Sequence, residues 1–149
     1  MRAVAPAPEA KPFLKWVGGK RQLLPVLRTY YPAAVHGYHE PFLGSGAVFF
    51  DLWTGGRLTG CPVWLSDENP DLVGCYLRIR DAADAVIAEL ERLAEGHAAG
   101  GRDFYYEVRD QYFNPRRAAW AAANGTPEAY PVDLAAALIY LNKTGYNGL

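Results

Sequence analysis

Residues 40–46 read Glu-Pro-Phe-Leu-Gly-Ser-Gly and, with the cluster at residues 15–20, are the most informative feature of the chain. A strand-like run, residues 38–42, leads into a turn with two glycines, and an apolar run, residues 47–53, follows. A strand, a glycine turn and a helix in this order form a cradle for nucleotide-type cofactors. The glycines let the backbone approach a ligand where a side chain would collide. A strand, loop and helix without a ligand is the alternative that the turn alone leaves open.

Position 49 argues against a dinucleotide cofactor. A dinucleotide fingerprint has a third Gly or Ala three residues after its second glycine, because helix and strand pack closely beside the pyrophosphate. Here that position, three residues after Gly46, is Phe49. S-adenosylmethionine (SAM) has no phosphate, so the constraint disappears. A glycine turn beside an aromatic residue suits SAM well.

A second buried-strand pattern, residues 63–66, ends at Asp67, which lies 21 residues after Gly46. An acidic residue at the tip of the second strand, about 20 residues past the glycine turn, is where a ribose diol is held. A carboxylate there can accept hydrogen bonds from both hydroxyls. The sequence therefore predicts a ribose-binding acid at this strand end.

Helix capping explains part of the same polar cluster. Asn69 is a good N-cap, Pro70 fits the first helical position, and Asp71 suits the positive end of the helix dipole. This assignment leaves Asp67 or Glu68 for a ligand, and we favour Asp67.

Four blocks of the sequence resemble the Dam-type DNA adenine-N6 methyltransferases, the alpha group of the D12 class. They stand in the family's order at residues 13–20 (FLKWVGGK), 40–46 (EPFLGSG), 66–69 (SDEN) and 140–148 (YLNKTGYNG). The resemblance implies an α/β fold of the Rossmann-like SAM-dependent methyltransferase type. It also implies site-specific methyl transfer from SAM to the exocyclic amine of a flipped adenine in double-stranded DNA.

The resemblance assigns cofactor roles residue by residue. Trp16 and Lys20 would line the SAM pocket from the N-terminal side, and Asp67 would hold the ribose. An aromatic face can lie against a sulfonium or an adenine ring, although an ordinary core tryptophan is the alternative for Trp16. The full set of expected SAM contacts is Trp16, Lys20, Glu40, Pro41, Phe42, Gly44, Ser45, Gly46 and Asp67.

The resemblance places DNA contacts in the C-terminal block, at Lys143, Tyr146 and Asn147. A lysine can meet a phosphate, and a Tyr or Asn side chain can fill the gap that a flipped base leaves. A helix C-cap followed by a turn, with Gly145 and Gly148, is the structural alternative.

The catalytic block of the family, Asp-Pro-Pro-Tyr, is absent from these 149 residues. In the family its Asp and a backbone carbonyl accept the amine hydrogens of adenine, and its aromatic ring stacks on the flipped base. The nearest string, residues 114–117 (Asn-Pro-Arg-Arg), lacks the second proline and the ring, and it is predicted to stop a helix. No catalytic residue is assigned in this chain.

The length also suggests a part of a larger enzyme, because 149 residues do not suffice for a seven-stranded methyltransferase sheet plus a recognition region. We expect a disordered leader at 1–10, the N-terminal part of the SAM domain at 11–76 and the start of a helical target-recognition region at 77–149. A truncated chain, a proteolytic product and half of a split gene all fit, and the last needs a partner chain with the catalytic block. The alternative function is a non-catalytic SAM- or DNA-binding subunit or remnant that completes a partner chain.

Charge and cysteine content add little. The net charge is −1, but residues 10–39 hold five cations and no carboxylate, and Arg116 and Arg117 form a second small cluster. Cys61 and Cys75 are expected to be reduced thiols of a cytoplasmic protein, and the three histidines lack metal-ligand spacing.

The sequence does not separate a restriction-modification role from repair or regulation. A small-molecule methyltransferase is a third possibility, and the block at 143–148 argues against it.

The rest of the chain has helical periodicity. One stripe is expected to end at Gly96, with a flexible hinge at 97–101, and another to close at the C-cap candidate Gly145. The predicted helical regions lie at about 20–30, 70–80, 86–94, 104–113 and 134–141.

Overall fold

The computed structural model describes residues 10–145, which form two compact units. The first unit holds residues 10–13 and 18–66, and the second holds residues 14–17 and 67–145. This division falls ten residues before the functional boundary expected at 76/77, which stays a prediction. The expected leader lies outside the described residues except for Ala10.

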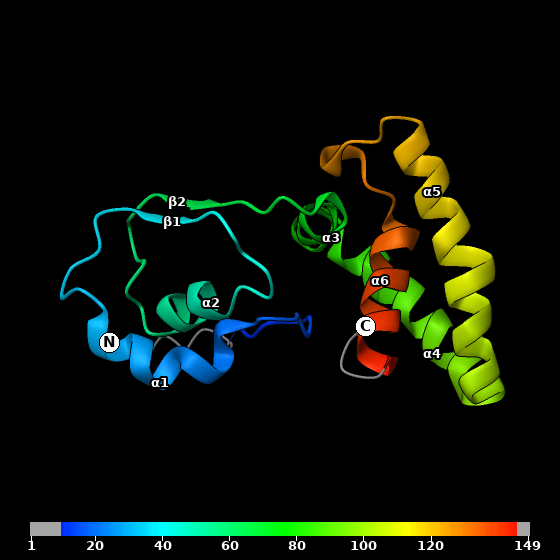
Figure 1. Cartoon of the computed structure of the whole chain (residues 1–149), viewed down its shortest axis with the longest axis horizontal. Coiled ribbons are helices and arrows are strands. Elements are labelled where there is room, and N and C mark those ends of the chain that lie inside the picture. Colours follow the sequence, from blue (N-terminus) through cyan, green and yellow to red (C-terminus); the bar gives the residue numbers. More distant parts are fainter. Residues whose placement is uncertain (1–9, 146–149) are drawn as a thin grey trace, which may run out of the picture. The chain divides into compact units, whose positions relative to one another are not determined.

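The first unit contains two parallel strands and two α-helices (Figure 1). Strand β1 (Tyr38–Glu40) pairs with β2 (Val63–Leu65), with Glu40 opposite Leu65. The order of strand, glycine turn and helix is confirmed. The strand ends two residues earlier than expected, because the next backbone bond to Ser66 is donated by Leu43 and not by Phe42, the regular ladder position.

Helix α2 (Ala47–Thr54) follows the glycine turn and packs its buried residues Ala47 and Leu52 into the unit. The helix expected at 20–30 is an irregular succession of short turns. A 3₁₀ turn (Lys20–Leu23), helix α1 (Leu24–Leu27) and a second 3₁₀ turn (Arg28–Tyr30) follow one another. Pro25 lies in the first turn of α1, where a missing N–H costs nothing.

The second unit is helical, and α6 (Val132–Thr144) is its central element. Eight of its residues are buried, including Leu134, Tyr140 and Asn142. Helices α3 (Pro70–Asp81) and α4 (Ala83–Tyr106) pack against it. A π-helix (Glu107–Phe113), helix α5 (Asn114–Ala122) and a 3₁₀ turn (Pro127–Ala129) connect α4 to α6. Figure 1 shows α4 and α6 side by side within this unit.

The expected helix end at Gly96 is wrong. Helix α4 continues through Gly96, and its only non-helical backbone is at Gly101, with φ +54° and ψ −129°. A Cβ at Gly96 would collide with the ring of Phe104. The glycine therefore serves close packing against the turn after the kink, and the sequence pattern alone does not separate this role from a cap.

The expected helix stop at residues 114–117 is also wrong, because α5 begins there. Pro115 lies in the first turn of α5, which directly continues the π-helix (Glu107–Phe113), since Phe113 and Asn114 both keep right-handed helical backbone. Gly145 is confirmed as the C-cap of α6, and its N–H donates to the carbonyl of Leu141 at 2.8 Å.

None of the helices within residues 10–145 has the length and apolar character needed to cross a bilayer. In the same residues, no group of three or more His, Cys, Asp or Glu side chains is arranged to hold a metal ion. Both cysteines are free thiols, Cys75 buried and Cys61 half-buried.

Candidate functional site

The glycine turn lies between the carboxyl end of β1 and the start of α2. Gly44 and Gly46 both have left-handed backbone, with φ +52° and +69°. The turn closes where the Gly46 N–H donates to the carbonyl of Leu43 at 2.8 Å. Gly46 is also the N-cap of α2. A residue with a Cβ is disfavoured at both glycines, so the sequence dictates this turn locally.

Two hydrogen bonds extend the strand pairing into the turn. The Ser66 N–H donates to the carbonyl of Glu40 at 3.0 Å, and the Leu43 N–H donates to the carbonyl of Ser66 at 3.1 Å. The turn is therefore fixed to the end of β2. In a parallel sheet this carboxyl edge is where ligands bind.

Lys20 supports the turn from the side. Its Nζ donates to the carbonyl of Phe42 at 2.8 Å and lies 3.5 Å from Oε1 of Glu40. Glu40 is 6% exposed, and its Oε2 accepts the hydroxyl of Tyr38 at 2.7 Å. Burial and this bond to Glu40 raise the pKa of Tyr38 far above its usual value. Glu40 is therefore a buried carboxylate with a cation and a hydroxyl donor, and the same lysine connects it to the turn at Phe42.

The turn presents one large aromatic side chain to solvent. Phe42 is 69% exposed, whereas Ser45 and Gly46 are buried. An exposed ring beside a rigid glycine turn is a surface on which a ligand can pack. The sequence predicted that Trp16, Lys20, Phe42, Gly44, Gly46 and Asp67 converge on one pocket. The structure brings Lys20, Phe42 and the two glycines together in the first unit, and Trp16 and Asp67 belong to the second.

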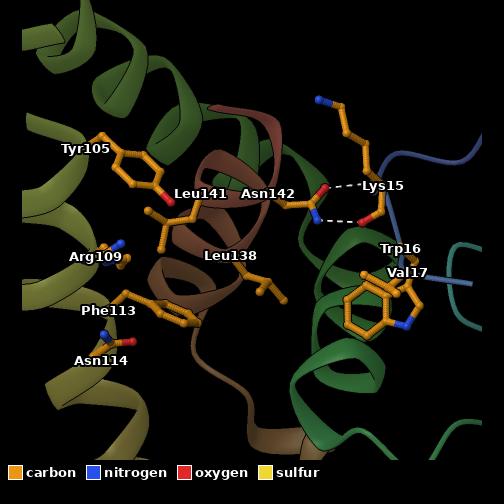
Figure 2. Close-up of a pocket in the computed structure, with 10 residues that line it drawn as sticks. All are labelled: Lys15, Trp16, Val17, Tyr105, Arg109, Phe113, Asn114, Leu138, Leu141 and Asn142. Atoms are coloured by element: carbon orange, nitrogen blue, oxygen red, sulfur yellow. Dashed lines mark hydrogen bonds between the residues drawn. The ribbon is translucent and has the colours of Figure 1, made fainter. Parts of the chain in front are cut away.

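Trp16 lies in the second unit, where it lines a mostly apolar cavity of about 440 Å³. Figure 2 shows side chains from the 14–17 segment, the α4–α5 region and α6 around this cavity. The lining residues are Lys15, Trp16, Val17, Tyr105, Arg109, Phe113, Asn114, Leu138, Leu141 and Asn142. A cavity of this size and character fits an aromatic ring or a small ligand.

Asn142 holds the Trp16 segment in place. Its Oδ1 accepts the Lys15 N–H at 2.8 Å, and its Nδ2 donates to the Lys15 carbonyl at 2.6 Å (Figure 2). Asn142 is 5% exposed. This role of Asn142 was not predicted, although a polar residue four positions after Leu138 on an apolar helix face is a usable signal.

The start of α3 confirms the predicted cap. Asn69 Oδ1 accepts the N–H groups of Asp71 and Leu72 at 3.0 and 3.1 Å. The expectation that Asp67 takes no part in local capping needs correction, because its Oδ1 accepts the Asn69 N–H at 3.0 Å. A short Asp side chain makes this turn readily. The proposed ribose contact must therefore coexist with the turn.

Residues 16–149 match the sequence model of a family described as D12 class N6 adenine-specific DNA methyltransferase. The chain belongs to this family. It is 38% identical to the type II methyltransferase M.MjaIII of Methanocaldococcus jannaschii, over 95% of this chain and 48% of the relative. It is 29% identical to a DNA adenine methylase of Haemophilus influenzae, over 99% of this chain and 45% of the relative. A DNA adenine methylase of Escherichia coli K12 is 30% identical, over 92% and 42%. The chain thus spans less than half the length of these relatives.

In this D12-class methyltransferase chain, the positive cluster at the start of α5 is engaged by carboxylates. Arg116 NH2 lies 2.5 Å from Oδ2 of Asp133, and Arg117 Nε donates to Oδ2 of Asp71 at 2.7 Å. The bond to Asp71 raises the pKa of Arg117. Asp71 is therefore more than the helix-dipole partner that the sequence suggested.

Of the residues that the resemblance to D12-class methyltransferases assigns to DNA, only Lys143 is described. It lies in the last turn of α6 and is exposed. Tyr146 and Asn147 lie outside the described residues. The DNA contacts of all three residues, like the whole expected set of SAM contacts, remain predictions.

Proposed function

We propose that this chain supplies the SAM-binding part of a site-specific DNA adenine-N6 methyltransferase with a Rossmann-like α/β fold. The observation that carries the proposal is the rigid turn with two left-handed glycines at the carboxyl end of β1. Its backbone can approach a ligand closely, and Ser66 and Lys20 hold it on both sides. Family membership supports the same reading.

The residues present fit SAM. Its phosphate-free structure suits a turn whose helix carries Phe49 in place of a third small residue. Phe42 offers an exposed ring for a sulfonium or an adenine. The chain continues from Ser66, which is bonded to the turn, directly into Asp67, the proposed ribose acid. The full proposed set is Trp16, Lys20, Glu40, Pro41, Phe42, Gly44, Ser45, Gly46 and Asp67.

When bound, SAM supplies an electrophilic methyl group on a sulfonium. The residues of this chain bind and orient the cofactor, and Lys20 keeps the glycine turn in the geometry that receives it. Lys143, with Tyr146 and Asn147, would contact double-stranded DNA around the target adenine. In this proposal residues 11–76 belong to the cofactor domain and 77–149 open the target-recognition region.

Activation of the adenine amine needs an Asp-Pro-Pro-Tyr block, which these 149 residues do not contain. We infer that a continuation of the chain or a complementary chain supplies it, so residues 1–149 alone are inactive. The same absence favours the second candidate function, a non-catalytic SAM- or DNA-binding subunit that completes a partner.

The proposal is tested by calorimetric titration of SAM into the full-length protein and its Asp67→Ala variant. Loss of a carboxylate that accepts from hydroxyls costs about 1.5–3 kcal/mol, or roughly 10–150-fold in affinity. Glu68→Ala, at the exposed neighbouring acid, is the control and should bind SAM as tightly as the parent. Unchanged affinity in Asp67→Ala would remove Asp67 from the site.

A further inference from the structure

A continuous series of hydrogen bonds runs within the helical unit from Asp67 to α5. The Asn69 N–H donates to Asp67, and the Asp71 N–H donates to the side chain of Asn69. The Asp71 carboxylate then accepts from Arg117 of α5 at 2.7 Å and from the Tyr130 hydroxyl at 3.1 Å. The first two bonds join a backbone N–H to a side chain, and the last two join side chains, so the first turn of α3 is held at its backbone and at Asp71.

Burial makes the far end of this series rigid. Asp71 is 4% exposed and Tyr130 is 1% exposed. A buried carboxylate is tolerated only when it is paired and hydrogen-bonded, and here both of its oxygens have a donor. Removal of Arg117 would leave the Asp71 carboxylate with only one of these two donors, the Tyr130 hydroxyl.

The Tyr130 side chain packs tightly against α3. A Cβ at Gly74 of α3 would collide with the Tyr130 side chain, so the ring lies directly against the helix backbone. A second contact comes from Arg78, whose NH2 donates to the carbonyl of Glu128 at 2.9 Å. Helix α3 is thus held at two points by the Pro127–Ala129 turn and its flank.

We propose that Asp71, clamped by Arg117 and Tyr130, is a positioning residue that fixes the orientation of Asp67 toward the cofactor. The affinity for SAM then depends on an arginine of α5, a helix of the expected target-recognition region. This inference rests on the proposed ribose contact of Asp67. It goes beyond that contact because none of these three residues would touch the cofactor.

The neighbouring ion pair provides a matched control. Arg116 and Arg117 have the same exposed side-chain fraction, 51%, and each meets an Asp carboxylate. Asp133, the partner of Arg116, belongs to α6 and has no part in the hydrogen bonds at the start of α3. Loss of Arg116 therefore removes a cation and an ion pair from α5 without releasing Asp71.

The test measures SAM affinity of the full-length protein by calorimetry, with the folded state checked by thermal melting. Arg117→Ala should weaken SAM binding by about 2–30-fold, the range for residues that act through a network. Arg116→Ala should stay within about twofold of the parent. Arg117→Lys, which keeps one donor and the charge, should recover part of the loss. Tyr130→Phe is the milder variant if Arg117→Ala does not fold.

The decisive arm is a double-mutant cycle with Asp67→Ala. If Arg117 acts through Asp67, Arg117→Ala should change SAM affinity little in the Asp67→Ala background. Additive losses in the double mutant would contradict the inference. So would a lower melting temperature with unchanged SAM affinity in Arg117→Ala or Tyr130→Phe. Either result would give the cluster a purely structural role and leave the proposed ribose contact of Asp67 standing. Unchanged affinity in Asp67→Ala itself would overturn the proposed ribose contact and this inference together.

Discussion

The side-chain amide of Asn142 bonds to both backbone groups of Lys15, accepting from the N–H at 2.8 Å and donating to the carbonyl at 2.6 Å. The two residues lie 127 positions apart in the sequence. The Asn142 amide thus pairs with both backbone groups of Lys15, as a neighbouring strand would, and holds the segment that carries Trp16. The cavity beside Trp16 therefore depends on a residue of the central helix.

We expect Asn142→Ala to lower the free energy of unfolding by about 1–3 kcal/mol, because two partly buried hydrogen bonds to the Lys15 backbone are lost. Asn142→Asp should also destabilise, since a carboxylate cannot donate to the Lys15 carbonyl. Urea unfolding of the full-length protein measures both effects. Lys143→Ala, at the exposed neighbour, should change stability by less than about 0.5 kcal/mol. Equal stability of Asn142→Ala and Lys143→Ala would contradict the clamp.

Lys20→Met should weaken SAM binding, because the variant loses the bond to the Phe42 carbonyl and leaves Glu40 without its cation. A loss of about 0.5–1.5 kcal/mol corresponds to roughly 2–13-fold in the dissociation constant. The control is Arg21→Met, which removes a cation next to Lys20 that makes no bond to the turn. Calorimetry that finds the same affinity for both variants would show that Lys20 does not shape the cofactor site.

Gly46→Ala should destabilise the protein by about 1–2 kcal/mol, since φ is +69° and an L-residue with a Cβ is strained there. Gly37→Ala is the matched substitution in the same unit. Its Cβ would meet Trp64 at an ordinary 3.6 Å, and the backbone is not left-handed. Thermal melting should separate the two variants. A Gly46→Ala protein as stable as Gly37→Ala would mean that the turn does not require its glycine.

Burial raises the pKa of the Cys75 thiol to about 12, from an ordinary value of 9.0. Because the folded pKa lies above the unfolded one, this thiol's contribution to stability is complete below pH 9 and falls as pH rises toward 12. At pH 8 a thiol reagent should modify the half-buried Cys61 and leave Cys75 untouched until the protein unfolds. Equal modification rates at both cysteines of the native protein would contradict the burial of Cys75.

The features that the sequence predicted well are local ones. The glycine turn after β1, the Asn69 cap of α3 and the Gly145 end of α6 follow from the conformations of a few adjacent residues. Predictions of helix ends from local sequence were wrong where contacts between side chains determine the backbone path. Gly96 looks like a helix end, but the Phe104 ring requires a glycine there, and Pro115 opens a helix that it was expected to stop.

The parts of the site that escaped prediction depend on contacts between distant segments. Asn142 reaches Lys15 across 127 positions, and Asp71 meets Tyr130 across 59 and Arg117 across 46. One sequence without the fold cannot pair such residues. The expected cofactor residues could be named because they stand in short contiguous blocks that resemble the family.

Methyl transfer tests the central proposal most directly. SAM with a labelled methyl group is incubated with unmethylated duplex DNA and either the full-length protein or residues 1–149 alone, and the DNA is then digested to nucleosides. We expect label in N6-methyladenine only when a polypeptide with the Asp-Pro-Pro-Tyr block is present, and none from residues 1–149 alone. Robust transfer by residues 1–149 alone, or label on another base, would contradict the proposed division of cofactor binding and catalysis.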